Sequence, residues 1–271
     1  MTRIADAFAR LSRERRKGLV AYLTAGFPSL SETIDLVLAA EGAGADVVEL
    51  GVPWSDPSAD GPVIQRAMER ALDGGATLAR SLELIGELRR RRCEVPIVLF
   101  GYYNPIYAFG PARAARAAAE AGVDGLLTVD LPLEEAEELD APCRAHGLDR
   151  IPLLAPTTSP ERAARHAARG SGFAYYVALT GVTGAGHLDA ANVAARVSAL
   201  RPSLGALPLA VGFGVKDAAS ARAVAAPADA VVVGSAIVQA IDAAPDARAR
   251  VEAVRSLVST LRDALDGKTN T

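Results

Sequence analysis

Short apolar runs alternate with helical segments along this 271-residue chain, and the alternation predicts an α/β protein. Eight such runs occur, and none shows the clean alternation of apolar and polar residues that is typical of a half-exposed strand. Strands that are buried on both faces belong to a parallel sheet covered by helices. The sequence therefore predicts a single (β/α)8 TIM barrel with an extra N-terminal helix, and a doubly wound open sheet is the alternative.

The N-terminal helix is predicted over residues 2–17, because Ile4, Phe8 and Leu11 recur at helical spacing and share one face. Runs of Val, Ile, Leu and aromatic residues bounded by Gly, Pro or Asp predict the strands. The eight predicted strands cover residues 19–24, 46–50, 95–100, 124–129, 151–155, 173–179, 207–211 and 229–233.

Proline and glycine mark the connections between these strands. Pro62 suits the first turn of a helix that begins after Gly61. Residues 101–105 contain an Asn-Pro pair and are predicted to be the exit loop of the third strand. No linker or low-complexity segment interrupts the pattern, which predicts one domain. We expect this domain to cover residues 1–271, with the barrel over about 18–265 and a C-terminal tail over 266–271.

Composition excludes several classes of function. Hydrophobic residues make up 50% of the chain and charged residues 23%, which is typical of a globular protein with a sizeable core. The net charge of -3 and the pI near 5.7 argue against nucleic acid or an anionic membrane as a partner. The two cysteines and three histidines lack metal-ligand spacing, so no metal site is predicted. Without a signal peptide or a long apolar run, a cytoplasmic protein is expected.

The second predicted strand carries an acidic residue at an unusual place. Glu49 lies within an apolar run, where an unpaired carboxylate costs several kcal/mol or takes up a proton. Asp60 follows eleven residues later in a polar loop. Two carboxyl groups in different surroundings are what proton transfer at both ends of a bond requires. The alternative is structural: Glu49 would bind a neighbouring amide, and the loop residues Asp56 and Asp60 would only form turns.

The carboxyl ends of the strands are the expected position of the site, because TIM barrels carry their catalytic groups there. The residues predicted to converge on this end, in chain order, are Glu49, Asp60, Tyr102, Asn104, Asp130, Tyr175 and Thr183. Aromatic side chains are expected to line the pocket, although each could instead fill the barrel interior. These aromatic residues are Tyr22, Phe100, Tyr102, Tyr175 and Phe213.

Glycines after the seventh and eighth strands predict an anion site. Gly212-x-Gly214 and Gly234-Ser235 each precede a helix start, where backbone N–H groups and the helix dipole favour an anion. Glycine lets the backbone approach a ligand closely, and these two loops are the usual phosphate position of the barrel. Gly184, in the loop after the sixth strand, adds a third glycine. A single glycine at such a turn could simply end the strand, but the glycines of all three loops together predict phosphate binding.

Several motifs closely resemble the tryptophan synthase alpha subunit family. The longest is V-E-L-G-V-P-W-S-D-P-S-A-D-G-P-V-I-Q, over residues 48–65. The resemblance runs in order from about Phe8 to Leu265 without a large insertion. Shorter motifs are G-Y-Y-N-P-I-Y at 101–107, D-L-P-L-E-E-A at 130–136, A-P-T-T-S-P at 155–160, L-T-G-V-T-G at 179–184, V-G-F-G at 211–214 and V-V-V-G-S-A-I-V at 231–238.

This resemblance implies a barrel that cleaves indole-3-glycerol phosphate to indole and glyceraldehyde 3-phosphate. It implies that Glu49 transfers protons at indole C3 and at the glycerol hydroxyl, that Asp60 binds the indole N–H, and that Tyr175 borders the substrate. It also implies a beta-subunit partner in an alpha2beta2 complex, with pyridoxal phosphate only in that partner and no cofactor in this chain. The remaining substrate-binding positions implied are Tyr22, Phe100, Tyr102, Leu127, Thr183, Gly184, Phe213, Gly214, Gly234 and Ser235.

The chain departs from the family pattern mainly in two loops that contact the beta subunit in the family. A stand-alone indole-3-glycerol phosphate lyase that releases free indole is therefore an alternative. A catalytically weak activator of a beta subunit is another, and the intact Glu49 and Asp60 argue against it. The departures are Trp54, Ser58, Val129, Leu179 and Gly186.

Overall fold

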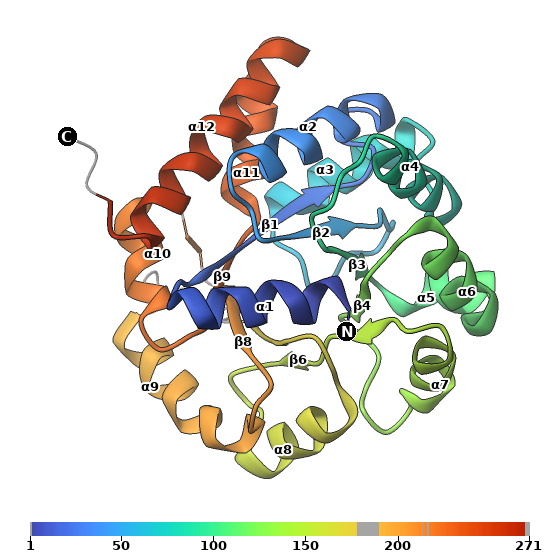
Figure 1. The fold of residues 1–271 in the computed structure, drawn as a ribbon. Helices are drawn as coiled ribbons and strands as arrows, with labels where there is room; N and C mark the ends of the chain where they lie inside the picture. Colours follow the sequence, from blue (N-terminus) through green and yellow to red (C-terminus); the bar gives the residue numbers. More distant parts are fainter. Residues whose placement is uncertain (1, 178–189, 213, 216, 269–271) are drawn as a thin grey trace.

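A ring of parallel strands lies inside a layer of helices in the computed structural model, which describes residues 2–177, 190–212, 214–215 and 217–268 (Figure 1). The strands are β1 (Gly18–Thr24), β2 (Val47–Gly51), β3 (Ile97–Gly101), β4 (Gly125–Thr128), β5 (Asp149–Arg150), β6 (Leu153–Leu154), β7 (Ala174–Val177), β8 (Leu209–Gly212) and β9 (Ala230–Val233). Each predicted strand overlaps an observed one, and the sheet order is β5-β4-β3-β2-β1-β9-β8-β7-β6.

The helices cover the outside of this ring. They are α1 (Arg3–Glu14), α2 (Leu30–Gly42), α3 (Pro62–Asp73), α4 (Leu78–Arg90), α5 (Tyr103–Phe109), α6 (Pro111–Ala121), α7 (Glu137–Ala145), α8 (Pro160–Arg169), α9 (Ala190–Leu200), α10 (Ala218–Ala225), α11 (Ser235–Ala243) and α12 (Ala247–Leu265), with a 3-10 turn at Arg201–Leu204. In the described part of the chain, no helix is both long and apolar enough to cross a membrane. Helix α5 corrects the prediction of a loop over residues 101–105: Pro105 falls in the first turn of α5, where a helix tolerates proline.

The ring closes near the fifth predicted strand, residues 151–155, where the structure has two short strands: β5 just before this range and β6 within it. β5 pairs with β4, and β6 pairs with β7. Between them, Ile151 donates its N–H to the carbonyl of Leu126, whereas the carbonyl of Pro152 accepts from Tyr175. Pro152 has no N–H of its own, so the strand changes partner at this residue. The prediction of one unbroken strand over residues 151–155 is therefore wrong, whereas the barrel is confirmed.

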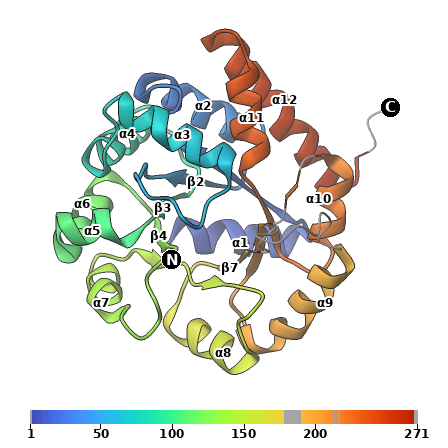
Figure 2. The same cartoon turned by 180° about the vertical axis from the view of Figure 1, so that it is seen from behind.

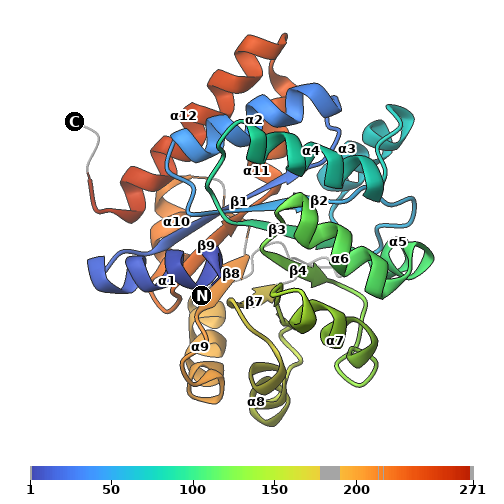
Figure 3. The same cartoon turned by 45° about the vertical axis from the view of Figure 1, so that its right-hand side comes forward.

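Helix α1 lies across the N-terminal end of the barrel (Figures 1 and 3). It is shorter than the predicted residues 2–17, because Arg15 adopts a left-handed conformation (φ 54°) that ends it. The side chains of Ile4 and Phe8 are buried on the barrel side, and the rings of Phe8 and Phe173 are 5.4 Å apart. Since α1 covers this end, a ligand enters the barrel from the opposite end.

Buried carboxylates at the N-terminal end of the strands are all paired. Asp46, before β2, accepts hydrogen bonds from the N–H of Leu19 at 3.0 Å and from Arg262 at 2.8 Å. Asp124, before β4, accepts from Arg89 and from the N–H of Ile97, both at 2.7 Å. Charged partners and backbone donors of this kind offset the cost of removing a carboxylate from water. These pairs connect helices α4 and α12 to the sheet. They also show how a buried carboxylate is normally stabilised in this protein.

Candidate active site

Strand β2 places Glu49 inside the ring. In the parallel register Glu49 lies between Tyr22 on β1 and Val98 on β3. Its side chain is only 1% exposed, and ionisation of Glu49 would raise the pKa of the hydroxyls of both Tyr22 on β1 and Tyr175 on β7. Because side chains alternate along a strand, Val48 and Leu50 face the helices while Glu49 faces the barrel interior.

Glu49 differs from the paired carboxylates at the other end of the barrel. Among the described residues, its Oε1 has no hydrogen-bond partner. Burial raises the pKa of the Glu49 carboxyl to about 8, because the charged form loses its hydration. The carboxyl therefore carries a proton at neutral pH. A protonated, unpaired acid inside a barrel mouth is chemically poised to give up a proton and to take it back.

Asp60 lies in the segment between β2 and α3, which curves over the open end of the barrel (Figure 2). The hydroxyl of Tyr102 donates to Asp60 Oδ2 at 2.7 Å, and the same hydroxyl accepts from the N–H of Ala59 at 2.9 Å. Gln65 holds the backbone of this segment by donating to the carbonyl of Asp60 at 2.9 Å. Burial raises the pKa of Asp60, whereas the hydrogen bond from Tyr102 lowers it. The two carboxyl groups thus have different surroundings.

Aromatic rings form a wall beside these two acids. The rings of Tyr22 and Phe100 are 5.4 Å apart and those of Phe100 and Tyr175 are 6.4 Å apart, both edge to face. Leu127 on β4 lies in register with Phe100 and is fully buried. These contacts join β1, β3, β4 and β7 across the interior. The structure therefore brings together Tyr22, Phe100 and Tyr175, three of the five aromatic residues predicted to line the pocket, whereas Tyr102 binds Asp60 and Phe213 lies outside the described residues. Aromatic and aliphatic side chains of this kind suit an apolar ring system.

Two tyrosine hydroxyls lie directly against strand-end glycines, a feature that the sequence analysis missed. A Cβ atom on Gly51 would lie 2.2 Å from the hydroxyl of Tyr22, and one on Gly212 would lie 2.2 Å from that of Tyr175. A larger residue at either glycine would displace the hydroxyl. The strand register explains both contacts. Tyr22 pairs with Glu49, two residues before Gly51, and Tyr175 pairs with Ala210, two residues before Gly212.

The predicted phosphate loops are partly described. Gly234 precedes helix α11, and a Cβ on it would meet the side chain of Tyr22 at 3.5 Å. Ser235 is exposed at the first position of this helix, whose first N–H groups have no partner within the helix. Gly214 has a φ of 39°, which favours glycine. Thr183, Gly184 and Phe213, which complete the predicted site, lie outside the described residues.

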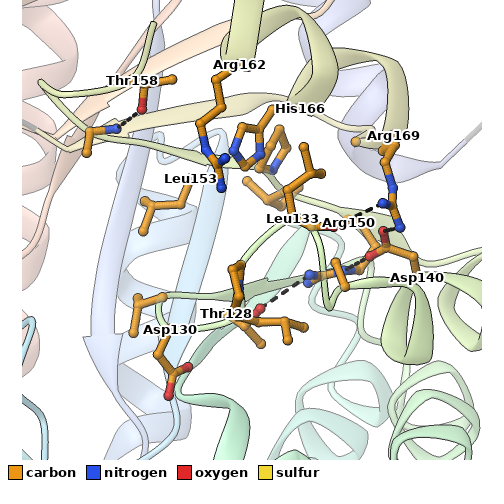
Figure 4. A pocket seen from close by; sticks show the side chains of 18 of the residues that line it. Thr128, Asp130, Leu133, Asp140, Arg150, Leu153, Thr158, Arg162, His166 and Arg169 are labelled. Atoms are coloured by element: carbon orange, nitrogen blue, oxygen red, sulfur yellow. Dashed lines mark hydrogen bonds and ion pairs between the residues drawn. The ribbon is translucent and has the colours of Figure 1, made fainter.

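A separate cavity of about 470 Å³ lies between helices α7 and α8 (Figure 4). Its charged groups are already paired: Arg150 donates to Asp140 at 2.9 Å, and Arg162 donates to both oxygens of Glu134 at 2.9 Å. Asp130 lines this cavity and accepts from the N–H of Tyr103 at 2.7 Å, although the sequence placed Asp130 with the catalytic groups. Neither Glu49 nor Asp60 lines this cavity, so it is separate from the site of the two acids.

The described residues contain no group of three or more His, Cys, Asp or Glu side chains that could hold a metal ion. The two cysteines are both buried and free, and burial raises the pKa of each thiol to about 12.

Comparison with known proteins decides the family. The sequence model of the tryptophan synthase alpha chain family matches residues 8–266. The chain belongs to this family. The tryptophan synthase alpha chain of Chromobacterium violaceum is 52% identical over 265 residues, which cover 98% of this chain and all of that protein. The alpha chain of Nitrosococcus oceani is 51% identical over 271 residues and covers both chains fully.

Solved structures of tryptophan synthase alpha chains have the same fold. The crystal structure from Legionella pneumophila has a TM-score of 0.90 and 39% identity and covers both chains fully. A tryptophan synthase structure from Mycobacterium tuberculosis has a TM-score of 0.87 and 34% identity, covering 97% of this chain and 98% of that one. The tryptophan synthase alpha chain is a lyase that cleaves indole-3-glycerol phosphate and passes indole to a beta subunit. The predicted family, barrel and reaction are thereby confirmed.

Proposed function

We propose that Glu49 and Asp60 are the two catalytic carboxyl groups of the lyase reaction. The observation that carries this proposal is the buried carboxyl of Glu49, whose Oε1 has no hydrogen-bond partner among the described residues and whose pKa burial raises to about 8. Asp60 complements it, because a hydrogen bond from Tyr102 favours its charged form. One group enters the reaction with a proton and the other with a negative charge, as acid–base cleavage requires.

In the proposed reaction Glu49 transfers the protons and Asp60 stabilises the charge on the indole ring. Protonated Glu49 gives its proton to indole C3, which breaks the aromaticity of the five-membered ring and places positive charge on the ring nitrogen. The carboxylate of Asp60 accepts the indole N–H hydrogen bond and stabilises that charge. Glu49, now ionised, takes the proton of the glycerol hydroxyl as the bond from C3 to the glycerol carbon breaks. The bonding electrons return to the ring, indole and glyceraldehyde 3-phosphate form, and Glu49 is protonated again.

Tyr102→Phe is expected to move the acid limb of the pH profile of kcat/KM upward. The substitution removes the hydroxyl that donates to Asp60, so its carboxyl is protonated at higher pH. A hydrogen bond to a charged group is worth about 1.5–3 kcal/mol, so kcat/KM at the acid end should fall by roughly tenfold or more. Steady-state rates measured from pH 5 to pH 9 test this. If the acid limb of the kcat/KM profile lies at the same pH in Tyr102→Phe and in the parent, Tyr102 does not influence the catalytic ionisation of Asp60.

The substrate phosphate is proposed to bind where β8 and β9 end, at Gly214, Gly234 and Ser235. Thr183, Gly184 and Phe213, which lie outside the described residues, belong to the same proposal by family resemblance. Gly234→Ala tests it cleanly, since the added methyl meets Tyr22 only at ordinary contact distance, 3.5 Å. KM should rise several-fold while kcat changes little, because phosphate contacts hold ground state and transition state alike.

Gly86→Ala on helix α4 is the matched control, because an added Cβ there meets only Arg90, at 3.6 Å. Its KM should equal that of the parent. Equal KM values for Gly234→Ala and the parent would place the phosphate elsewhere.

The chain is proposed to work as one barrel domain in a cytoplasmic alpha2beta2 complex, and to need no cofactor or nucleic acid partner itself. In this family pyridoxal phosphate belongs to the beta subunit. Turnover with and without beta subunit distinguishes this assembly from a stand-alone lyase that releases indole. A rate that rises strongly with added beta subunit supports the complex, and an equal, high rate without it supports the stand-alone enzyme.

A further inference from the structure

The hydroxyl of Tyr22 occupies a position that the reaction proposed above does not use. Tyr22 is 2% exposed and lies on β1 in register with Glu49. Its ring packs edge to face on Phe100, and its hydroxyl reaches the end of β2, where it fills the space of a side chain on Gly51. The hydroxyl therefore lies at the level where β2 leads into the segment that carries Asp60.

The proton of this hydroxyl is available. Thr24 donates its own hydroxyl to the Tyr22 oxygen at 3.4 Å, and this is the only hydrogen bond of the Tyr22 hydroxyl to the described residues. The Tyr22 oxygen thus acts as an acceptor, and its O–H has no acceptor among the residues that the structure describes. Buried donors in native proteins almost always find a partner, so a free one inside an active site points to a bond completed when the site is filled.

The charges around Tyr22 indicate which acceptor this is. Burial is the main cause that raises the pKa of the Tyr22 hydroxyl, and the next is the negative charge of Asp60, ahead of that of Glu49. The hydroxyl stays protonated and is therefore a donor throughout the working pH range. For Tyr175 the order is reversed, since Glu49 acts on it more strongly than Asp60 does. The hydroxyl of Tyr22 is thus coupled more strongly to Asp60, and that of Tyr175 more strongly to Glu49.

We propose that Tyr22 is a positioning residue for Asp60: its hydroxyl donates the second hydrogen bond to the Asp60 carboxylate when substrate fills the site. The first comes from Tyr102, at 2.7 Å. Hydrogen bonds within a site commonly shorten on forming the substrate complex. Two donors hold the carboxylate in one orientation and favour its charged form, which the developing positive charge on indole needs. This inference rests on the proposed role of Asp60.

Tyr22→Phe tests the inference, because phenylalanine keeps the ring against Phe100 and removes only the hydroxyl. The measurement is kcat/KM of the complex with beta subunit from pH 5 to pH 9. We expect the acid limb to move up by about half to one pH unit, with a loss of roughly 3- to 10-fold on that limb. Above the limb the rate should return close to that of the parent. Thermal unfolding verifies that the variant is folded.

Two comparison variants separate the possible failures. Tyr175→Phe also removes a hydroxyl in the barrel interior, but one that lies against Gly212 and is coupled more strongly to Glu49 than to Asp60, and it should leave the acid limb in place whatever it does to kcat. Tyr102→Phe should move the acid limb. If Tyr102→Phe moves it and Tyr22→Phe lowers kcat/KM equally at every pH, or not at all, the role of Tyr22 is wrong. If neither Tyr102→Phe nor Tyr22→Phe moves the acid limb, both the proposed role of Asp60 and that of Tyr22 are wrong.

Discussion

Glu49→Gln is expected to lower kcat by at least ~10²-fold, the usual contribution of a positioned proton-transfer group. Glutamine has the same shape and remains buried, but its amide neither gives a proton to indole C3 nor takes one from the glycerol hydroxyl. KM should change little, because the packing of Tyr22 and Phe100 around the site is untouched. Single-turnover cleavage of indole-3-glycerol phosphate, with beta subunit present, separates the chemical step from product release.

The matched control is Glu83→Gln on helix α4, where the same chemical change is made at an exposed position outside the barrel interior. Its kcat should equal that of the parent. A Glu49→Gln enzyme that retains more than about a tenth of the parental kcat would contradict the assignment of proton transfer to Glu49, given the minimum worth of such a group.

The second large effect concerns stability. The pKa of Glu49 is about 8 in the folded protein, against a reference value of 4.5. Between these two pH values the folded state holds a proton that the unfolded state has lost, so the free energy of unfolding falls as pH rises through this window. The stabilisation is complete below pH 4.5 and lost above pH 8. The difference corresponds to on the order of 5 kcal/mol, from about 1.4 kcal/mol per pH unit.

Urea unfolding of the parent and of Glu49→Gln at pH 5 and at pH 8.5 measures this effect. Glutamine carries no titrating group, so the variant should gain several kcal/mol relative to the parent between the two pH values. Other titrating groups are common to both proteins and cancel in the comparison. A difference between the two proteins that is the same at both pH values would mean that the Glu49 carboxyl is ionised in the folded state at both.

The pattern of apolar residues alone is sufficient to predict the fold class of the protein. Continuous apolar strands such as β2 and β9 have no exposed face, which left a parallel sheet as the only suitable class. Glu49 was recognisable because a carboxylate in such a strand is costly. Helix α5 is not predicted from the sequence, because an Asn-Pro pair usually indicates a loop, although proline also fits the first turn of a helix.

Contacts between distant segments could not be predicted from local pattern. The bond from Tyr102 to Asp60 joins residues 42 positions apart, and which loop residue accepts it depends on how the segment after β2 folds back. The same holds for the hydroxyl of Tyr22 against Gly51, which requires the register of two strands. The division of the fifth strand was visible in principle, since Pro152 lacks the N–H that an unbroken strand would use.

The most direct measurement is the titration of the Glu49 carboxyl itself in the parent protein. Carbon-13 NMR of glutamate-labelled protein, with the Glu49 signal assigned by its absence in Glu49→Gln, follows its protonation from pH 4 to pH 10. A buried acid without a partner should titrate with a midpoint near pH 8, well above its reference value of 4.5. A midpoint near 4.5 would show a carboxyl that is hydrated or paired in solution, and would contradict the assignment of Glu49 as the proton-carrying acid of the reaction.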